Sequence, residues 1–467
     1  MAPGSGLRKS FFRRGTRGDR RAGLTESTPI SIIVSNKAAE TRVRATHTPI
    51  DESKPLNRIQ LSRRAGDEIL RTGTSIAIRR LLTRLLPAGL LFVIWTGCRT
   101  GEAVEHSADS GKRIEAERVA ACPACAADLI DQLGLREAPT PVRERPGWSA
   151  PQTVVVFGNE ALLARLRAAA PGVEIVDGND STALARSLAL ADAVIGACWG
   201  GMVTAGTNLE WIQLPSAGAE RCVNIPGIKE RGILITNAQR LYGPEIAEHV
   251  IAMMFAFSRG LYRYIPAQQE GAWSRRILER SQLWELEGRT MLVVGLGGIG
   301  TEVAWRADAL GMRVLATRRS SREGPEFVDY VGTADELIEL ARQADVVVNT
   351  APLTPETTGL FDAEFFAAMK PTAYFINVGR GKSVVTADLL SALESGAIAG
   401  AGLDVTDPEP LPSGHPLWRL PNVIITPHIS GMSDGAAERL STLMEENLRR
   451  YMAGERMLSV VDVERGY

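Results

Sequence analysis

The stretch that most constrains this chain is MLVVGLGGIG, residues 291–300. Four apolar residues typical of a buried strand lead directly into three glycines with the spacing G-x-G-x-x-G. A helical pattern follows over 301–310, and a second apolar strand pattern covers 313–317. A strand, a glycine turn, a helix and a second strand within ~30 residues are typical of dinucleotide binding at the edge of a parallel sheet. The sequence therefore predicts a nucleotide-binding α/β lobe built on this stretch.

The glycines of this stretch are predicted to have separate roles. Gly295 allows the tight turn, Gly297 lets the backbone approach a pyrophosphate, and Gly300 lets the helix pack close to the strand. The phosphates would lie on the amides at the start of the helix, where Gly298 and Ile299 are found. The alternative interpretation is a structural turn that binds no ligand.

The end of the second strand predicts which nicotinamide cofactor is bound. NAD-binding units usually carry an acidic residue there, which accepts hydrogen bonds from the adenosine ribose. Here the position holds Arg318, followed by Arg319, Ser320 and Ser321. A guanidinium pairs with a 2′-phosphate that a carboxylate would repel, and hydroxyls can add hydrogen bonds. We therefore expect NADP(H), with NAD(H) or a solvated basic turn as the alternatives.

The N-terminal part of the chain differs in composition from the rest. Residues 1–84 carry a net charge of +11, and the remaining residues carry −12. An acidic body argues against nucleic acid as a partner, because binding phosphates requires concentrated positive charge. Residues 1–150 are predicted to be a largely disordered extension, rich in Arg, Ser, Thr and Gly in its first half.

An apolar segment within this extension bears on where the protein is located. The uncharged run 85–98 follows a basic flank at 79–84; it is too short to span a bilayer but fits the core of a signal peptide. Its end, WTGC, resembles a bacterial lipoprotein cleavage box, so a true start near residue 76 would give an exported lipoprotein anchored at Cys98. We favour the alternative, a cytoplasmic protein with a buried or interfacial helix, because NADP is recycled in the cytoplasm.

The cysteines suggest neither a disulfide framework nor a metal site. The chain has five, and they are widely scattered. Cys122 and Cys125 form a single CxxC, which without a second pair cannot complete a tetrahedral zinc site. Incidental cysteines and the absence of a bound metal are the predicted outcome.

From residue 152 onward, strand and helix patterns alternate, which predicts parallel sheets with helices on both faces. We expect two doubly wound lobes. A flavodoxin-like substrate lobe would span 152–250 and be completed by 432–467, with a Rossmann NAD(P)-binding lobe inserted at 251–431. A helix opening at Gly243-Pro244 would connect the lobes, and an amphipathic helix at 436–453 would return to the first.

Three polar residues follow predicted strands of the second lobe, at the edge where open α/β sheets bind ligands. Reduction of a 2-oxo acid needs a cation for the carboxylate and carbonyl, and an acid that protonates the carbonyl oxygen. Arg380 supplies a bidentate guanidinium, and His428 suits the acid. Glu409 would favour the protonated imidazolium. The alternative is that all three are structural or surface residues.

With these residues identified, the sequence over about 152–467 resembles the D-isomer-specific 2-hydroxyacid dehydrogenase family, and its glyoxylate/hydroxypyruvate reductase branch in particular. The resemblance implies NAD(P)H-dependent reduction of a small 2-oxo acid to the D-2-hydroxy acid, with Arg380, Glu409 and His428 catalytic. The motifs that carry it are GLGGIG (295–300), NVGRG (377–381), GLDVTDPEP (402–410) and TPH (426–428).

The resemblance also implies binding residues and an assembly. Substrate carboxylate binding is expected at the backbone of Ala217 and Gly218, and a homodimer through the cofactor lobes. A sensing protein of the same fold without significant turnover, like the family's co-repressor branch, is the alternative function. The substrate itself is not predicted. Trp199 and Trp418 could wall its pocket, and simple packing is the alternative role for these large aromatic residues. Further cofactor contacts are implied for Ala351, Pro352, Val378, Gly379 and Asp404.

Overall fold

The computed structural model describes residues 31–36, 39–44 and 123–466. The chain divides into two compact units, Met1–Val104 and Glu105–Tyr467. In the first unit, strands β1 (Ser31–Asn36) and β2 (Ala39–Arg44) form an antiparallel hairpin. This hairpin lies within the extension that the sequence predicts to be largely disordered. The signal-like segment 79–98 lies outside the described residues.

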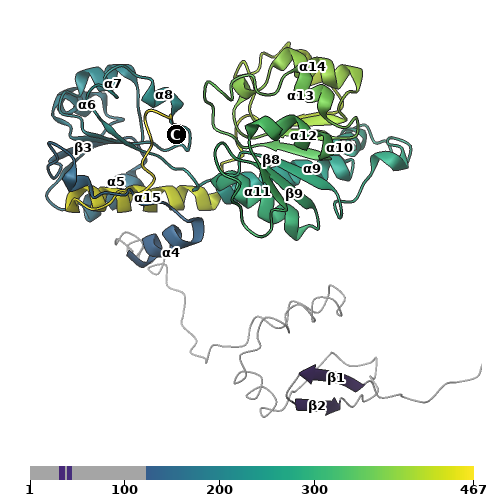
Figure 1. The fold of residues 1–467 in the computed structure, drawn as a ribbon. Coiled ribbons are helices and arrows are strands. Elements are labelled where there is room, and N and C mark those ends of the chain that lie inside the picture. The colour runs from purple at the N-terminus through teal and green to yellow at the C-terminus, as the bar shows by residue number, and fades with distance from the viewer. Residues whose placement is uncertain (1–30, 37–38, 45–122, 467) are drawn as a thin grey trace, which may run out of the picture. The chain divides into compact units, whose positions relative to one another are not determined.

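The second unit contains two parallel α/β lobes, as predicted (Figure 1). The first lobe has a five-stranded sheet in the order β4-β3-β5-β6-β7, which is the flavodoxin-like arrangement. Its strands are β3 (Thr153–Val156), β4 (Glu174–Asp177), β5 (Ala193–Ile195), β6 (Trp211–Gln213) and β7 (Leu234–Thr236). Its helices are α5 (Glu160–Ala169), α6 (Ser181–Ser187), η3 (Leu188–Leu190), α7 (Gly200–Ala205) and α8 (Glu220–Val223), where η denotes a 3₁₀ helix.

The second lobe has a seven-stranded sheet in the order β10-β9-β8-β11-β12-β13-β14. Its strands are β8 (Thr290–Val294), β9 (Arg313–Thr317), β10 (Tyr330–Gly332), β11 (Val346–Asn349), β12 (Tyr374–Asn377), β13 (Gly400–Leu403) and β14 (Val423–Ile425). Its α-helices are α10 (Leu261–Gln269), α11 (Gly298–Ala309), α12 (Leu337–Gln343), α13 (Ala363–Ala368) and α14 (Thr386–Ser395). Its 3₁₀ helices are η4 (Arg280–Gln282), η5 (Ala334–Glu336), η6 (Gly381–Ser383) and η7 (Pro416–Arg419).

Strand β8 lies inside the second sheet, between β9 and β11, and is buried on both faces. Leu292 and Val294 pack into one apolar cluster, while Met291 and Val293 pack into another on the opposite face. Successive side chains of a strand point to opposite faces, so a continuous apolar run is what a doubly covered parallel strand requires. This explains why the sequence around the glycine turn shows no polar alternation.

Two long helices connect the lobes. Helix α9 (Gly243–Ser258) follows the first lobe and packs against α11 of the second. Helix α15 (Asp434–Ala453) returns to the first lobe, where Tyr451 stacks on Trp211 with ring centroids 4.9 Å apart. This is the yellow helix that runs along the first lobe in Figure 1. The predicted insertion of one lobe within the other is confirmed.

The folded body begins earlier in the chain than predicted. Helix α4 (Pro123–Leu133) and η2 (Val142–Glu144) precede the first lobe. Leu129 and Leu135 are buried in a cluster with Leu443 and Leu458. Apolar residues at helical spacing in α4 cover one side of α15, so the boundary placed at residue 150 is wrong. Within the described residues, no helix is both long and apolar enough to cross a membrane.

Candidate active site

Two of the three predicted catalytic residues are in direct contact. His428 follows strand β14, and Glu409 lies in the loop after β13. The Nδ1 atom of His428 is 2.8 Å from Oε1 of Glu409. A carboxylate on Nδ1 fixes the imidazole ring and leaves Nε2 as the nitrogen that can meet a substrate. Both side chains are partly exposed, as an acid that must reach a substrate requires.

The backbone at His428 is unusual, and a buried carboxylate supports it. His428 has a positive φ of 54°, a conformation that non-glycine residues adopt only where the surroundings impose it. Asp404 accepts hydrogen bonds from Thr426 Oγ1 at 2.6 Å and from the amides of Ile429 and Ser430, each at 3.0 Å. Burial alone would raise the pKa of Asp404, but these hydrogen bonds lower it overall. The carboxylate of Asp404, 0% exposed, is therefore an anchor for the loop that carries His428.

His249 joins the same network from helix α9. Its Nε2 lies 3.0 Å from Thr426 Oγ1 and 3.8 Å from Asp404 Oδ1. Because α9 connects the lobes, this contact ties the position of the His428 loop to the connecting helix. A hydrogen-bonded role at the lobe junction accounts for His249 without direct catalysis.

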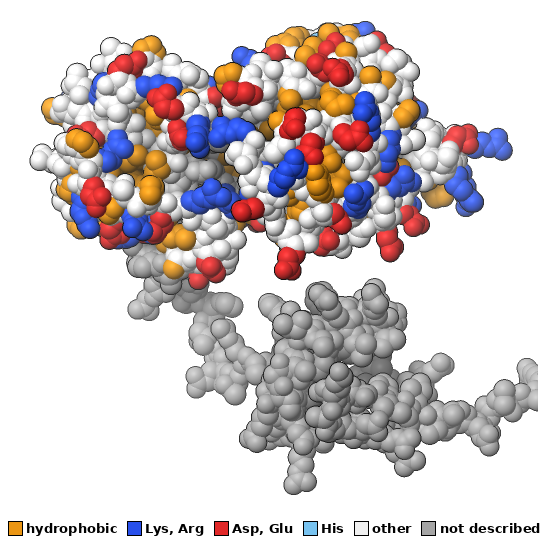
Figure 2. Space-filling view, viewed as in Figure 1, with side chains coloured by type: hydrophobic (Ala, Val, Ile, Leu, Met, Phe, Trp, Pro, Cys, Tyr) orange, Lys and Arg blue, Asp and Glu red, His pale blue; other side chains and the backbone are white. Residues whose placement is uncertain are grey.

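A cavity of about 690 Å³ brings the predicted triad together. Arg380, Glu409 and His428 all line it from the second lobe, while loops after β5 and β6 line it from the first. Figure 2 shows acidic and basic side chains mixed over the visible face, with basic side chains prominent where the two lobes meet. The triad therefore lies at the carboxyl ends of parallel strands, where the sequence places it.

Arg380 has a partner that the sequence did not predict. Its Nε donates to Oε1 of Glu220 at 2.8 Å, and its Nη1 donates to the Gly379 carbonyl at 2.8 Å. Glu220 belongs to α8 in the other lobe and also lines the cavity. A carboxylate two residues after the predicted substrate loop is the sequence signal that could have indicated it.

The predicted substrate loop lies beside Arg380. A Cβ added to Gly218 would come within 1.7 Å of Arg380 Nη2, so only glycine leaves room for this guanidinium. The carbonyls of the loop are occupied, because Asn237 Nδ2 donates to the Ala217 carbonyl and Ser216 Oγ to that of Gly218. The amides of Ala217 and Gly218 have no acceptor in the described part of the chain. Free amides next to a cation can hold a carboxylate.

The glycine turn has the geometry that dinucleotide binding needs. Gly295 has φ of 96°, and a Cβ there would lie 2.8 Å from the Ala351 backbone. A Cβ on Gly300 would lie 2.3 Å from the Gly295 carbonyl oxygen, whereas one on Gly297 would meet nothing within 4 Å. Helix α11 begins at Gly298 without a side-chain cap, so its first amides, including that of Ile299, are available to a pyrophosphate.

Arg318 lies at the end of β9, beside this turn. Its amide donates to the Gly332 carbonyl, and its buried Nε has no hydrogen-bond partner among the described residues. Its neighbours Arg319 and Ser320 are exposed. A buried guanidinium nitrogen without a hydrogen-bond acceptor destabilises the fold. A bound phosphate would supply that acceptor. The residues present therefore fit a 2′-phosphorylated nicotinamide cofactor.

Four other predicted cofactor residues lie in two loops that contact each other near the turn. Ala351 and Val378 are buried, and Pro352 follows Ala351 at the surface. A Cβ on Gly379 would lie 2.9 Å from Asn349 Nδ2 and 3.0 Å from the Ala351 carbonyl, so these loops are in close contact. They follow the neighbouring strands β11 and β12, which explains why segments distant in sequence meet here.

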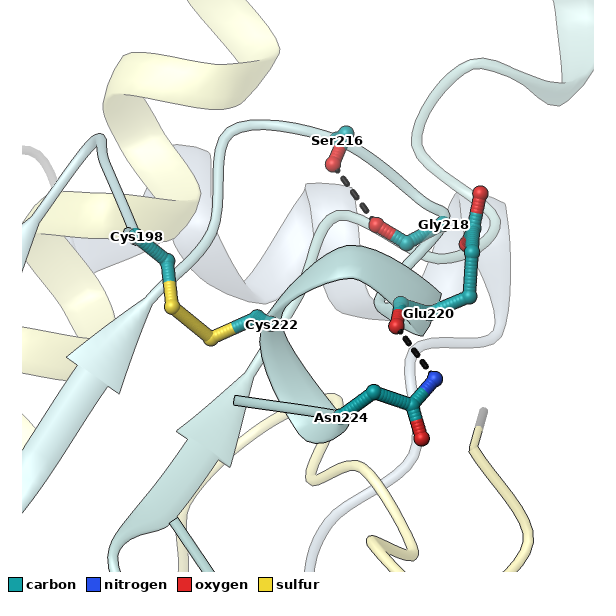
Figure 3. Close-up of a disulfide and its surroundings, with 6 residues drawn as sticks. All are labelled: Cys198, Ser216, Gly218, Glu220, Cys222 and Asn224. Carbon is teal, nitrogen blue, oxygen red and sulfur yellow. Dashed lines mark hydrogen bonds between the residues drawn. A yellow bond between two sulfur atoms is a disulfide. The ribbon is translucent and has the colours of Figure 1, made fainter. Parts of the chain in front are cut away.

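A disulfide in the first lobe differs from the prediction for the cysteines. Cys198 and Cys222 are joined, with their Cα atoms 5.7 Å apart (Figure 3). They follow the adjacent parallel strands β5 and β6, whose carboxyl-end loops meet although 24 residues separate the cysteines. Cys125, predicted to be incidental, is also disulfide-bonded; Cys122 lies outside the described residues. Sequence spacing does not reveal such a pair, because sheet topology brings it together.

Trp199 and Trp418 have packing roles, the alternative to walling the pocket. Among the described residues that line the cavity, neither Trp199 nor Trp418 is present. Trp199 packs edge-on against Phe157 at 5.3 Å, and Trp418 Nε1 donates to the Pro412 carbonyl. Leu214, Leu353 and Lys382 occupy the lining instead.

Comparisons with known proteins agree with this geometry. Residues 251–430 match the family described as D-isomer specific 2-hydroxyacid dehydrogenase, NAD binding domain. The human glyoxylate reductase/hydroxypyruvate reductase is 38% identical over 263 residues, covering 55% of this chain and 77% of the relative. The glyoxylate reductase of Pyrococcus furiosus is 34% identical, covering 52% of this chain and 73% of the relative.

Solved structures give the same picture. A D-isomer specific 2-hydroxyacid dehydrogenase from Xanthobacter autotrophicus, in complex with NADPH and MES, has a TM-score of 0.60 at 28% identity. An NADPH-dependent glyoxylate/hydroxypyruvate reductase from Sinorhizobium meliloti, in complex with NADP and sulfate, has a TM-score of 0.60 at 27% identity. Each match covers 68% of this chain and 100% of the other.

Proposed function

The chain belongs to the D-isomer-specific 2-hydroxyacid dehydrogenase family, and from this premise we propose that it reduces glyoxylate or hydroxypyruvate with NADPH. Its general chemistry is that of an NAD(P)-dependent oxidoreductase acting on small 2-oxo and 2-hydroxy acids. The observation that carries the narrower proposal is the cavity in which Arg380 and the His428–Glu409 pair face the loop of Gly218.

The proposed mechanism assigns one task to each side chain. The free amides of Ala217 and Gly218, with Arg380, bind the substrate carboxylate. Arg380 also polarises the carbonyl, and His428 donates a proton to its oxygen as negative charge develops there. Glu409 stabilises the imidazolium before that transfer. The bound nicotinamide would supply the hydride to the carbonyl carbon.

Charge near the glycine turn supports NADPH over NADH. Burial lowers the pKa of Arg240, and the nearby charges of Arg136 and Arg318 lower it further. Arg240 also packs on the turn itself, because a Cβ on Gly298 would lie 2.6 Å from its Cγ. Arg240 and Arg318 therefore place positive charge beside the turn, which favours a ligand that carries an additional phosphate.

The experiment that tests the function is a turnover assay. The full-length chain would be given glyoxylate, hydroxypyruvate, pyruvate or phenylpyruvate with NADPH and then with NADH, while reduced cofactor is followed by absorbance. Faster oxidation of NADPH with the first two acids is the expected result. Turnover with NADH alone would contradict the cofactor proposal. Cofactor binding without turnover of any acid would favour the sensing alternative.

We also propose a homodimer through the cofactor lobes. The segment 261–283, called the arm here, begins with helix α10 and exposes large apolar side chains: Leu261, Ile265 and Trp273 are 45%, 53% and 96% exposed. The same arm encloses a cavity of about 710 Å³ away from the triad. Several large apolar side chains exposed on one short segment are typical of a protein interaction site. Trp273→Ser should lower the molar mass measured by light scattering toward that of the monomer. A variant that stays a dimer would contradict this interface.

The location of the protein stays a prediction. Recycling of NADP(H) favours the cytoplasm, whereas disulfides persist in oxidising compartments and favour export with an anchor at Cys98. Fractionation of cells that express the full-length chain or the Cys98→Ala variant distinguishes these. A membrane-bound protein released by the substitution would support the lipoprotein, and a cytoplasmic protein in both cases would support the original prediction.

A further inference from the structure

The contact between Glu220 and Arg380 joins the two lobes at the substrate cavity. The pair is made by Arg380 Nε and Glu220 Oε1 at 2.8 Å, and the two side chains are only 28% and 26% exposed. Burial alone would raise the pKa of Glu220, but the charge of Arg380 and its hydrogen bond lower it overall. Glu220 is therefore ionised at neutral pH, and the hydrogen bond is charge-assisted.

Three contacts restrict the Arg380 guanidinium. Nε is held by Glu220, Nη1 by the Gly379 carbonyl, and Nη2 occupies the space that the missing side chain of Gly218 leaves. Nη2 has no hydrogen-bond acceptor among the described residues and lies beside the free amides of the substrate loop. An arginine fixed in this way has lost its rotamer freedom before the substrate arrives, which favours binding.

The helix that carries Glu220 is short, and a covalent bond holds it. Helix α8 spans four residues and has no side-chain hydrogen bond at its N-terminus. Cys222 in this helix is bonded to Cys198 in the loop after β5, as Figure 3 shows together with Glu220. At the other end, Asn224 Nδ2 donates to the Glu220 carbonyl at 2.7 Å. Both cysteines line the same cavity as Glu220 and Arg380.

We propose that Glu220 is a positioning residue for Arg380, and that the Cys198–Cys222 disulfide keeps the helix carrying Glu220 in place. The inference rests on the proposed function, since it concerns how Arg380 is prepared for a 2-oxo acid. Reduction of the bond by a dithiol would add two electrons and two protons, giving two thiols while the dithiol becomes a cyclic disulfide. Helix α8 would then lose its covalent link, and the cavity would lose affinity for its substrate.

The first test changes Glu220. We expect Glu220→Ala to raise KM for the best 2-oxo acid on the order of 10- to 100-fold, with a smaller effect on kcat. Glu220→Gln keeps an oxygen that can accept from Nε, so it should recover part of the affinity. A KM for Glu220→Ala within about twofold of wild type would overturn the positioning role.

Two controls separate positioning from a loss of folding. Glu160→Gln breaks a chemically similar carboxylate–arginine pair in the same lobe, with Arg167 at 3.0 Å, outside the cavity. It should leave KM unchanged. NADPH binding should be the same in all variants, because the glycine turn belongs to the other lobe. A Glu220→Ala variant that loses NADPH binding in proportion to substrate binding would contradict the proposal.

The second test changes the disulfide. Treatment of the wild type with a dithiol should raise KM, and the Cys198→Ser/Cys222→Ser double variant should start at the raised value and not respond. Because Cys125 is also disulfide-bonded, a dithiol could act there as well. The double variant keeps Cys125, so a change in KM that it does not show is due to the Cys198–Cys222 bond. A double variant with the wild-type KM would overturn the role of the disulfide.

A binding measurement keeps this inference separate from the proposed function. Oxamate, an unreactive analogue of a small 2-oxo acid, would be titrated into the NADPH-bound protein. Weaker oxamate binding by Glu220→Ala supports the positioning role even if no acid is turned over. Equal binding by the variant and the wild type overturns it, whatever the turnover assay gives.

Discussion

The two lobes contribute to the cavity in different ways. The cofactor lobe supplies Arg380, Glu409 and His428 from loops that directly follow its strands. The substrate lobe supplies the loop of Gly218 and two charged side chains of helix α8, Glu220 and Arg221; a disulfide at Cys222 ties this helix to the loop after β5. Under the proposed function, the reactive groups come from one lobe, and the contacts that position Arg380 come from the other. Substitutions in each lobe should consequently affect different steps.

The largest effect is expected in the cofactor lobe, at the proton donor. His428→Ala should lower kcat by about 100- to 10,000-fold, because it removes the general acid. The glycine turn is unaffected, so NADPH binding measured by fluorescence should be retained. His415→Ala serves as a matched control, because His415 caps η7 and does not line the cavity. Near-wild-type kcat in His428→Ala would refute the assignment.

In the substrate lobe, Gly218→Ala should act mainly on substrate binding. The new Cβ would lie 1.7 Å from Arg380 Nη2, so the guanidinium must move out of its position. Displacement of a positioned group by about 1 Å can cost on the order of 100-fold. We expect that loss in kcat/KM, most of it from KM. Steady-state kinetics at saturating NADPH measure it, and an unchanged KM would mean that the guanidinium does not need this space.

Arg318→Ala tests a function that belongs to the cofactor lobe alone. Loss of a charge-assisted contact with the 2′-phosphate should weaken NADPH binding by about 10- to 100-fold. NADH binding should stay the same. Arg313→Ala, at the opposite end of strand β9, is the matched control. Equal weakening for both cofactors would instead indicate a general loss of positive charge.

The smallest effect is expected at Asp404, which supports the His428 loop. Asp404→Asn places an amide against backbone N–H donors and should lower the free energy of unfolding by about 1–2 kcal/mol at neutral pH. The folded pKa of Asp404 is lowered, so its stabilising contribution is present above the unfolded pKa. That contribution is lost as the pH falls through the folded pKa. Denaturation below about pH 4 should therefore show a smaller difference between variant and wild type.

The comparison between lobes also explains what could be predicted. Arg380, Glu409 and His428 follow strands whose apolar runs are visible in the sequence, and parallel strands end at one edge of the sheet. Glu220 and the disulfide were missed because their partners lie on other elements, in one case 160 residues away. The early start of the fold at α4 was missed for the same reason, since its apolar stripe has meaning only against α15.

The sequence by itself determined the family, the two parallel sheets and the type of chemistry. Local patterns encode these: an apolar strand, a glycine turn, and polar residues at strand ends. Only the tertiary structure decided how the reactive groups are prepared. It placed Glu220 on Arg380, Asp404 beneath the His428 loop, and Cys198 against Cys222. The physical reason is that these contacts join segments from different strands or lobes, so sheet order and lobe packing set their distances.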